Sequence, residues 1–470
     1  MSHEIEADRN QTFLLPPALD DWVPPDHPAR FIAAFVDSLD LQSMGFKVGH
    51  TVTGRPRYSA RLLLSLICYC YFSRIRSHRD MERACLENVA VMWLTGLETP
   101  DHNTIWRFWD ENREQLRGLL KQSVHVAADM GLVGMVLNAV DGTKVQAQAS
   151  LKTGKYRRLL KPALEKVEDS IGEMEKRLQE SAGDELNSYR LPEGLADAHA
   201  RKEEIERSLK ELDEADAKSL NPHEPDARMM ECDGKKTFGY NGQAVSDDRI
   251  GIVVGADVVA GETDNGLLTD MIEKVEETVG EAAKETLADK GYSAAEDIGE
   301  AEEKGYEVLV NLPRNVAPPD GEKPFHSSRF AYDAERDCCV CPIDGILKYQ
   351  RTYEDRGKTV RVYHCTGYKD CLLRDACSSN KRGRTIKLGE HHQAVENQRQ
   401  KQKKPGSKAK LARRAVIIEP IFGIIKGNHG FRRWSVRNLD GVKTQWALMC
   451  TTVNLRKLYR VWAESLPAYA

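Results

Sequence analysis

The sequence predicts a mixed α/β fold, with a mixed β-sheet flanked by helices and a helical region ahead of it. Three observations support this prediction: apolar residues at helical spacing through residues 1–130, alternating strand and helix signals from Met135 to Pro313, and two heptad-like runs within residues 151–225. The chain has 470 residues, of which 41% are hydrophobic and 30% charged. This length and composition allow a substantial core and two to four domains.

Residues 1–130 are expected to form a helical N-terminal domain of several short helices. Polar residues suited to helix N-caps precede three of these helices: Asp26, Ser59, and Asp101 or Asn103. Gly96 is expected to end another. Residues 50–79 hold six arginines and no acid. Short helices with arginines between them fit a DNA-docking module, and they fit a plain helical core domain equally well.

Residues 131–150 and 226–324 carry most of the strand signals. Expected strands lie at residues 135–140, 235–248, 249–261, 284–291 and 306–313, and expected helices lie at 265–279 and 293–305. With the intervening segment set aside, the order is β-β-β-α-β-α-β. That order is typical of a mixed sheet with helices on its faces.

Three further segments complete the chain. Residues 151–225 contain apolar residues spaced three and four apart, which predicts an inserted helical hairpin. Residues 325–380 form a cysteine-rich insert. Residues 381–470 begin with a basic segment and then favour helices that complete the core. Within them, residues 381–437 hold sixteen lysines and arginines and three glutamates, a net charge of +13. This block fits a polyanion-binding face, and a solvated helix face is the alternative.

Composition also indicates the compartment. The N-terminus is polar and acidic, without the pattern of a signal peptide, and the longest apolar run, residues 62–72, is too short to span a bilayer. Eleven cysteines in such a chain favour reduced thiols or metal ligands over disulfides. We therefore expect a cytoplasmic protein without a membrane partner.

Three acids far apart in the sequence stand in apolar surroundings. Asp141 follows the apolar run of residues 135–140, Asp289 ends another short apolar segment, and Glu419 lies among isoleucines and a phenylalanine. Each has a simpler interpretation. Asp141 could belong to an Asp-Gly turn closing a hairpin, Asp289 could cap the next helix, and Glu419 could pair with a nearby arginine.

Together the three acids favour a metal site. A sheet can bring two strand-end carboxylates side by side, and a flanking helix can add a third. Close carboxylates repel one another, and Mg²⁺ or Mn²⁺ compensates this repulsion because these hard ions prefer oxygen ligands. Two ions about 3.5–4 Å apart can activate the attacking oxygen and stabilise the leaving oxygen in phosphodiester chemistry. Lys426, seven residues after Glu419, is a candidate phosphate contact.

Nine stretches in order from about residue 13 to residue 458 carry a family resemblance: LLPPALDDWVPPDHPARF, GRPRYSARLLLSLICYCY, PDHNTIWRFW, DGTKVQAQAS, GYNGQAV, LADKGY, RRAVIIEPIFGIIKG, GFRRWSVR and WALMCTTVNLRKL. On these stretches the chain resembles bacterial insertion-sequence DDE transposases of the RNase H-like superfamily, in the branch with a helical N-terminal domain and a cysteine-containing insert. The resemblance implies an RNase H-like catalytic core. It also implies that Asp141, Asp289 and Glu419 are the catalytic, metal-binding acids and that Lys426 is the lysine of the Glu-x6-Lys signature. The arginine ahead of the glutamate is either Arg413 or Arg414.

The implied reaction is metal-dependent strand cleavage at the element ends and transfer of the ends into target DNA. The implied partners are double-stranded DNA, in the form of terminal inverted repeats and target, and a second copy of the chain, so the protein would be nucleoid-associated when bound. Candidate DNA-binding residues are Lys144, Arg55, Arg57, Arg74, Arg76, Arg79, Arg413, Arg414, Arg432, Arg433 and Trp434, the last as a stacking surface. The alternatives are a catalytically silent DNA-binding descendant and an RNase H-like nuclease without strand transfer.

The cysteine-rich insert leaves two interpretations open. Its six cysteines fall within forty residues but lack the C-x2–4-C pairs of a standard zinc knuckle. A structural zinc site could use four of them: Cys341, Cys365, Cys371 and Cys377. Buried free thiols are the alternative, and His364 is another possible ligand.

Overall fold

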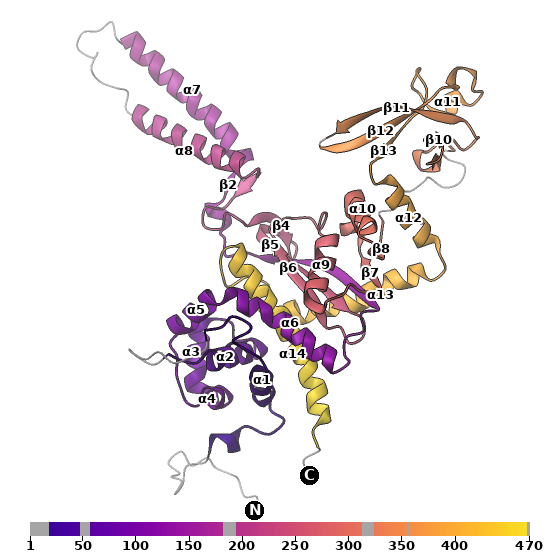
Figure 1. The fold of residues 1–470 in the computed structure, drawn as a ribbon. Coiled ribbons are helices and arrows are strands. Elements are labelled where there is room, and N and C mark those ends of the chain that lie inside the picture. The colour runs from indigo at the N-terminus through magenta and orange to yellow at the C-terminus, as the bar shows by residue number, and fades with distance from the viewer. Residues whose placement is uncertain (1–17, 48–56, 182–193, 313–323, 356, 468–470) are drawn as a thin grey trace, which may run out of the picture.

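The computed structural model describes residues 18–47, 57–181, 194–312, 324–355 and 357–467 (Figure 1). In these ranges the chain is mixed α/β, as predicted, and about half of it is helical. No helix in the described ranges has both the length and the apolar character needed to cross a membrane.

The N-terminal region is helical, as the apolar spacing predicts. It comprises the 3₁₀ turn η1 (Leu19–Trp22) and helices α1 (Pro28–Asp37), α2 (Ala60–Phe72), α3 (His78–Glu87), α4 (Val89–Thr95), α5 (His102–Glu111) and α6 (Arg113–Asp129). Ser59 and Asp101 cap α2 and α5, and Gly96 ends α4 in the left-handed conformation. The prediction of Asp26 as a cap is wrong, because the neighbouring His27 Nδ1 accepts the Ala29 N–H instead.

The central sheet has the predicted mixed order. Its strands are β1 (Leu137–Gln146), β4 (Arg228–Cys232), β5 (Lys235–Asp247), β6 (Val253–Val259), β7 (Glu285–Ala288) and β8 (Val308–Val310). The strand order is β4-β5-β1-β7-β8, and β6 also pairs with β5. β5 is antiparallel to β1, β4 and β6, whereas β7 is parallel to both β1 and β8. Helices α9 (Leu268–Val279) and α10 (Ala295–Glu303) connect the later strands. β4 is a strand that the sequence patterns did not indicate.

The first strand is longer than predicted. β1 continues through Asp141 and Gly142, which pair with Ala244 and Gln243 of β5. The interpretation of this Asp-Gly pair as a hairpin turn is therefore wrong. On one side, β1 pairs with the antiparallel strand β5 beyond the point where its parallel partner β7 ends on the other side. Asp141 therefore lies inside the β1–β5 ladder and not after it.

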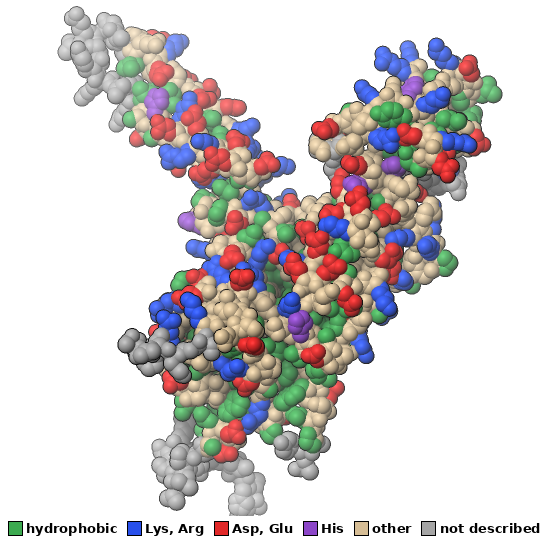
Figure 2. All heavy atoms as spheres, viewed as in Figure 1, with side chains coloured by type: hydrophobic (Ala, Val, Ile, Leu, Met, Phe, Trp, Pro, Cys, Tyr) green, Lys and Arg blue, Asp and Glu red, His purple; other side chains and the backbone are tan. Residues whose placement is uncertain are grey.

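A helical hairpin projects from the sheet region (Figure 1). It consists of α7 (Arg157–Ser181) and α8 (Leu195–Glu214), which pack against each other, and the short pair β2 (Lys155–Tyr156) and β3 (Ser219–Leu220) closes its base. The 3₁₀ turn η2 (Leu151–Thr153) precedes it. Acidic and basic side chains are intermixed over the hairpin surface (Figure 2), so it is not a face of a single charge.

The cysteine-rich segment forms a second, antiparallel sheet of order β13-β12-β11-β10-β9. Its elements are η4 (Ser327–Arg329), β9 (Ala331–Asp333), β10 (Cys338–Val340), β11 (Ile346–Asp355), β12 (Lys358–Cys365), η5 (Tyr368–Asp370), α11 (Arg374–Cys377) and β13 (Thr385–Gly389). It has a small core of its own around Cys339, Leu347, Tyr363 and Ile386.

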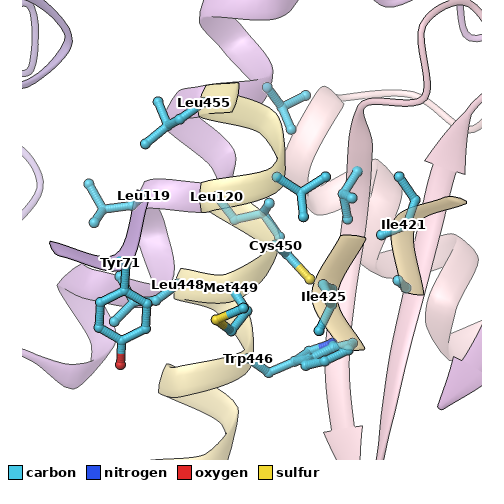
Figure 3. Close-up of a cluster of buried hydrophobic side chains, with 14 of the residues drawn as sticks. Tyr71, Leu119, Leu120, Ile421, Ile425, Trp446, Leu448, Met449, Cys450 and Leu455 are labelled. Atoms are coloured by element: carbon cyan, nitrogen blue, oxygen red, sulfur yellow. The ribbon is translucent and has the colours of Figure 1, made fainter. Parts of the chain in front are cut away.

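The last helices return to the central sheet. The chain runs through 3₁₀ turn η3 (Lys290–Tyr292) after β7, and later through α12 (His392–Lys403), α13 (Ser407–Phe422), the π-helical turn η6 (Gly423–Asn428) and α14 (Leu439–Ser465). α14 is the central helix of the core: Trp446, Met449 and Cys450 are fully buried and lie beside α6 and η6 (Figure 3). This packing explains why a helix with little amphipathic character is stable there, since it is covered on most sides.

Candidate functional site

Two of the predicted acids occupy equivalent positions on neighbouring strands. β1 and β7 run parallel with Ala139 opposite Leu287, and Asp141 and Asp289 each lie two residues further along. Parallel strands advance at the same rate, so the two carboxylates emerge at the same edge of the pairing. The negative charge of Asp289 is one of the influences on the pKa of Asp141, so the two side chains are close in space.

Asp141 is largely enclosed. Burial raises the pKa of its carboxyl, and the negative charge of Asp289 raises it further. The guanidinium of Arg414 opposes this shift, with Nη1 2.7 Å from Asp141 Oδ2, and the Gly142 N–H donates to Asp141 Oδ1 at 2.8 Å. Arg414 is therefore the main positive charge that opposes the rise in the pKa of Asp141.

Asp289 begins the 3₁₀ turn η3 immediately after β7. Its Oδ1 accepts the Gly291 N–H at 2.7 Å, so this side chain does cap the following turn, as one interpretation of the sequence held. The contact uses one carboxylate oxygen. The other oxygen has no hydrogen bond among the described residues and remains available to a ligand.

Glu419 reaches the site from α13, one of the helices that packs on β1. Its side chain is 64% exposed, and its Oε1 lies 4.0 Å from Arg414 Nη2. Arg414 is only 15% exposed and so stands between Glu419 and Asp141. Arg413 faces elsewhere and pairs with Asp248 at 2.7 Å. Of the two arginines left open by the sequence, Arg414 is thus the one at the acids.

A fourth acid lies beside these residues and was missed from the sequence. Asp264 Oδ1 accepts hydrogen bonds from Asn241 Nδ2 at 2.8 Å and from Gln243 Nε2 at 2.7 Å. Gln243 Oε1 in turn accepts a hydrogen bond from the buried Tyr292 hydroxyl. The motifs GYNGQAV and LADKGY contain three of these residues, but Asp264 lies in a Gly-Glu-Thr-Asp-Asn-Gly loop, which indicates only a turn.

Two glycines let Asp264 approach the strand ends. A Cβ on Gly142 would lie 2.6 Å from Asp264 Oδ1, and a Cβ on Gly291 would lie 2.9 Å from Asp264 Oδ2. Real Cβ atoms do not come this close to oxygen. Glycine one position after Asp141 and two positions after Asp289 therefore leaves the room in which the Asp264 loop packs against both segments.

The acids have the chemistry of a divalent-cation site. Carboxylate oxygens are the ligands that Mg²⁺ and Mn²⁺ prefer, and Arg414 already places one positive charge between Asp141 and Glu419. In this arrangement no three histidine, cysteine or acidic side chains of the described residues are grouped closely enough to share an ion. The donor set therefore fits such an ion in its chemistry, while Arg414 lies between Asp141 and Glu419.

Comparisons with known families agree with the resemblance found in the sequence. Residues 338–459 match the family described as "Transposase DDE domain", and residues 17–111 match the family described as "Transposase domain (DUF772)". Both matches indicate an insertion-sequence DDE transposase. No curated protein matches it. The DDE match includes Glu419 and Lys426 but neither Asp141 nor Asp289, so the roles of those two acids depend on the sheet geometry.

Two lysines of the transposase lie on one side of the acids. Lys426, in η6, donates to the Lys144 carbonyl at 2.8 Å and pairs with Asp233 at 3.1 Å. Arg432 pairs with the same carboxylate at 2.9 Å. Lys144 is three residues from Asp141 on a regular strand, so their side chains leave opposite faces. Lys426 and Arg432 therefore pair with Asp233 and not with Asp141, and the Lys144 side chain leaves the strand on the face opposite Asp141.

The other predicted DNA-contact residues differ in their exposure to solvent. Arg57, Arg74, Arg79 and Arg433 are exposed, and Arg55 lies outside the described residues. Arg76 is half-buried, donating to the His429 carbonyl at 2.7 Å. Trp434 is fully buried and its indole N–H donates to the Val145 carbonyl at 3.1 Å. The prediction that Trp434 stacks on DNA bases is wrong, because its ring is a core contact between strand β1 and α14.

Four cysteines of the second sheet line one cavity of about 330 Å³: Cys341, Cys365, Cys371 and Cys377. Each thiol is half-buried, and burial together with the neighbouring thiols raises the pKa of Cys377. Backbone N–H groups point at two of the sulfurs. The Gly345 N–H lies 3.0 Å from Cys341 Sγ, and a bond from the Gly367 N–H opposes the rise that burial causes in the pKa of Cys365. His364 instead contacts the Arg382 carbonyl.

Proposed function

We propose that this transposase cleaves DNA at the ends of its element and joins those ends to target DNA, using one acidic site for both steps. The observation that carries the proposal is the placement of Asp141 and Asp289 at matched positions of adjacent parallel strands, with Glu419 approaching from α13 beside Arg414. Three carboxylates from separate elements at one sheet edge suit phosphodiester chemistry better than they suit fold stability.

The core would be of the RNase H-like kind. Its strand order β6-β5-β1-β7-β8, with the first three strands antiparallel and the last two parallel to β1, supports this assignment. The domain boundaries follow from it as part of the proposal. The core comprises residues 131–150, 226–324 and the helices after residue 381, and the helical hairpin and the cysteine-rich sheet are insertions between its elements.

Asp141, Asp289 and Glu419 would hold Mg²⁺ or Mn²⁺, and two bound ions would supply an activated oxygen nucleophile and a stabilised leaving oxygen. The chain's own residues perform the other tasks. Arg414 neutralises Asp141 until the carboxylates have another counter-charge, and it then becomes free to contact a DNA phosphate. Lys426 and Arg432, held by Asp233, form a second cationic group on the DNA path.

Incubation with Mg²⁺ and DNA carrying the terminal inverted repeats tests the proposal. We expect nicking at the repeat ends followed by joining to a target plasmid. Binding alone would instead indicate a silent descendant, and cleavage without joining would indicate a nuclease. Asp141→Ala, Asp289→Ala and Glu419→Ala should each abolish cleavage and leave DNA binding within about twofold. An acid whose removal leaves cleavage intact has been assigned wrongly. Size measurement of the DNA complex tests the expected pairing of two chains on two ends.

We also propose that the four-cysteine cavity is a structural zinc site. Its support is the convergence of Cys341, Cys365, Cys371 and Cys377, with N–H groups aimed at two sulfurs, because such bonds favour the thiolate that zinc requires. No three of the described cysteines are yet within joint reach of one ion, so binding would draw them together. Metal analysis should find about one zinc per chain, and less than a tenth would exclude the site. Cys371→Ser should lower zinc content, whereas Cys450→Ser, a core thiol, should not.

A further inference from the structure

A groove of about 590 Å³ lies at the junction of α2, η6 and α14, apart from the acids. Its lining includes Arg456, Lys457 and Arg460 of α14 and only one acid, Glu464. Ile424 and Asn428 of η6, the turn that follows Glu419 in the chain, also line the groove. None of the proposed catalytic acids lines the groove.

Arg74 and Arg76 add positive charge next to the groove. Arg74 and Arg76 follow α2, and together with Arg456 they depress the pKa of the buried His429 to about 4, after burial itself. Burial and the charge of Arg460 likewise lower the pKa of Lys457 to about 8. Among the described residues, Arg74, Arg76, Arg456, Lys457 and Arg460 form no ion pair with a carboxylate. The cluster is therefore strongly cationic and uncompensated.

Several nitrogen atoms here have no hydrogen-bond partner. His429 is 3% exposed, yet both of its ring nitrogens lack partners, and Arg456 Nε is buried without one. The cations that do have hydrogen-bond partners donate to neutral carbonyls: Arg456 Nη2 to Phe72 at 2.6 Å, Arg76 to His429, and Lys457 to Gly251. Crowded cations and unpaired buried nitrogens both cost free energy unless an anion with several acceptor oxygens meets them.

We propose that this groove binds a backbone phosphate of DNA and so holds the strand beside the acidic site. A phosphate offers acceptor oxygens and the negative charge that the cluster lacks. The inference rests on the proposed function, because it assumes that DNA is the substrate. It adds Arg456, Lys457 and Arg460 to the DNA-binding surface, none of which the sequence had indicated.

The test uses the full-length Asp141→Ala protein in Mg²⁺-free buffer, so that binding is measured without cleavage. The double variant Arg74→Glu/Arg460→Glu changes two exposed arginines without removing a structural hydrogen bond. Arg158→Glu, an exposed arginine of the helical hairpin, is the matched control. We expect the double variant to bind labelled element-end DNA at least tenfold more weakly. The slope of log K against log salt should also be smaller, by about 1 for each phosphate that the variant no longer neutralises. The control should change neither quantity.

Each other outcome has a definite meaning. Equal affinity and equal slope for the double variant and the control would overturn the inference while leaving the proposed function intact. Failure of the parent protein to bind DNA at all would overturn both. Inorganic phosphate, tested at constant ionic strength by thermal shift, distinguishes the source of the anion. Stabilisation of the parent but not of the double variant, together with unchanged DNA affinity, would assign the groove to free phosphate and refute a DNA contact.

Discussion

Substitution of Gly142 by alanine tests how the Asp264 loop supports the acidic site. The new methyl group would meet Gln243 Nε2 first and would lie 2.6 Å from Asp264 Oδ1 and 2.8 Å from Asn241 Oδ1, so the packed polar groups must shift. Overpacking of this kind costs about 1–3 kcal/mol, against a gain of about 0.5–1 kcal/mol when alanine replaces glycine in a strand. We expect a net loss of about 1 kcal/mol in the free energy of unfolding, and of at most about 2.5 kcal/mol.

Urea unfolding followed by tryptophan fluorescence measures this loss, because Trp434 and Trp446 are buried beside the central sheet. Gly172→Ala is the control: nothing lies within 4 Å of a Cβ in that α7 position, so helix propensity should stabilise it by up to about 1 kcal/mol. In the Asp264→Ala background the cost of Gly142→Ala should shrink, giving a coupling of about 0.5–3 kcal/mol. Additive costs, or a Gly142→Ala protein as stable as the wild type, would refute the packing argument.

Three other predictions follow from individual contacts. Burial raises the pKa of Asp297 to about 6, so its contribution to stability is present below pH about 4 and is lost as the pH rises through 6. Asp297→Asn should therefore make the melting temperature change less between pH 4 and 7, and an unchanged pH dependence would contradict this. Trp434→Ala should lower the free energy of unfolding by about 3–5 kcal/mol, whereas a loss of DNA affinity in a protein of normal stability would restore the stacking role. Arg414→Ala should weaken DNA binding. It should also shift Mn²⁺ binding, measured by electron paramagnetic resonance, toward higher pH, because the pKa of Asp141 loses its main lowering influence. A pH profile of Mn²⁺ binding identical to that of the wild type would count against this arrangement.

Local patterns were sufficient for much of the fold. The helix ends at Ser59, Gly96 and Asp101 were predictable because a cap depends on residues three or four positions away. The strand and helix order from residue 135 to residue 313 was predictable for the same reason, since alternation and helical spacing are local signals. The prediction failed where a neighbouring residue could take the capping role. His27 caps α1 in place of Asp26, because its ring nitrogen accepts the Ala29 N–H.

Long-range pairing was not predictable in the same way. Asp141 looked like the end of a strand because its polar carboxyl broke an apolar run, yet the ladder with β5 continues for five residues beyond it. Asp264 gave no signal at all, because an acid in a glycine-containing loop indicates a turn, and only the packing of that loop on Gly142 and Gly291 brings it to the site. Trp434 looked like a stacking surface because arginines precede it in the sequence. Its burial depends on the residues of β1 and α14 that pack against it in the fold.

The sequence by itself determined the α/β class and the family resemblance, and it singled out three candidate acids, since these depend on residue type, spacing and order along the chain. Only the tertiary structure decided which residues meet. It placed Arg414, and not Arg413, between Asp141 and Glu419, and it brought the four cysteines to one cavity. It also gathered Arg74, Arg76 and Arg456 around His429. The physical reason is the same in each case: charge and hydrogen-bond complementarity act through space, between segments that lie far apart along the chain.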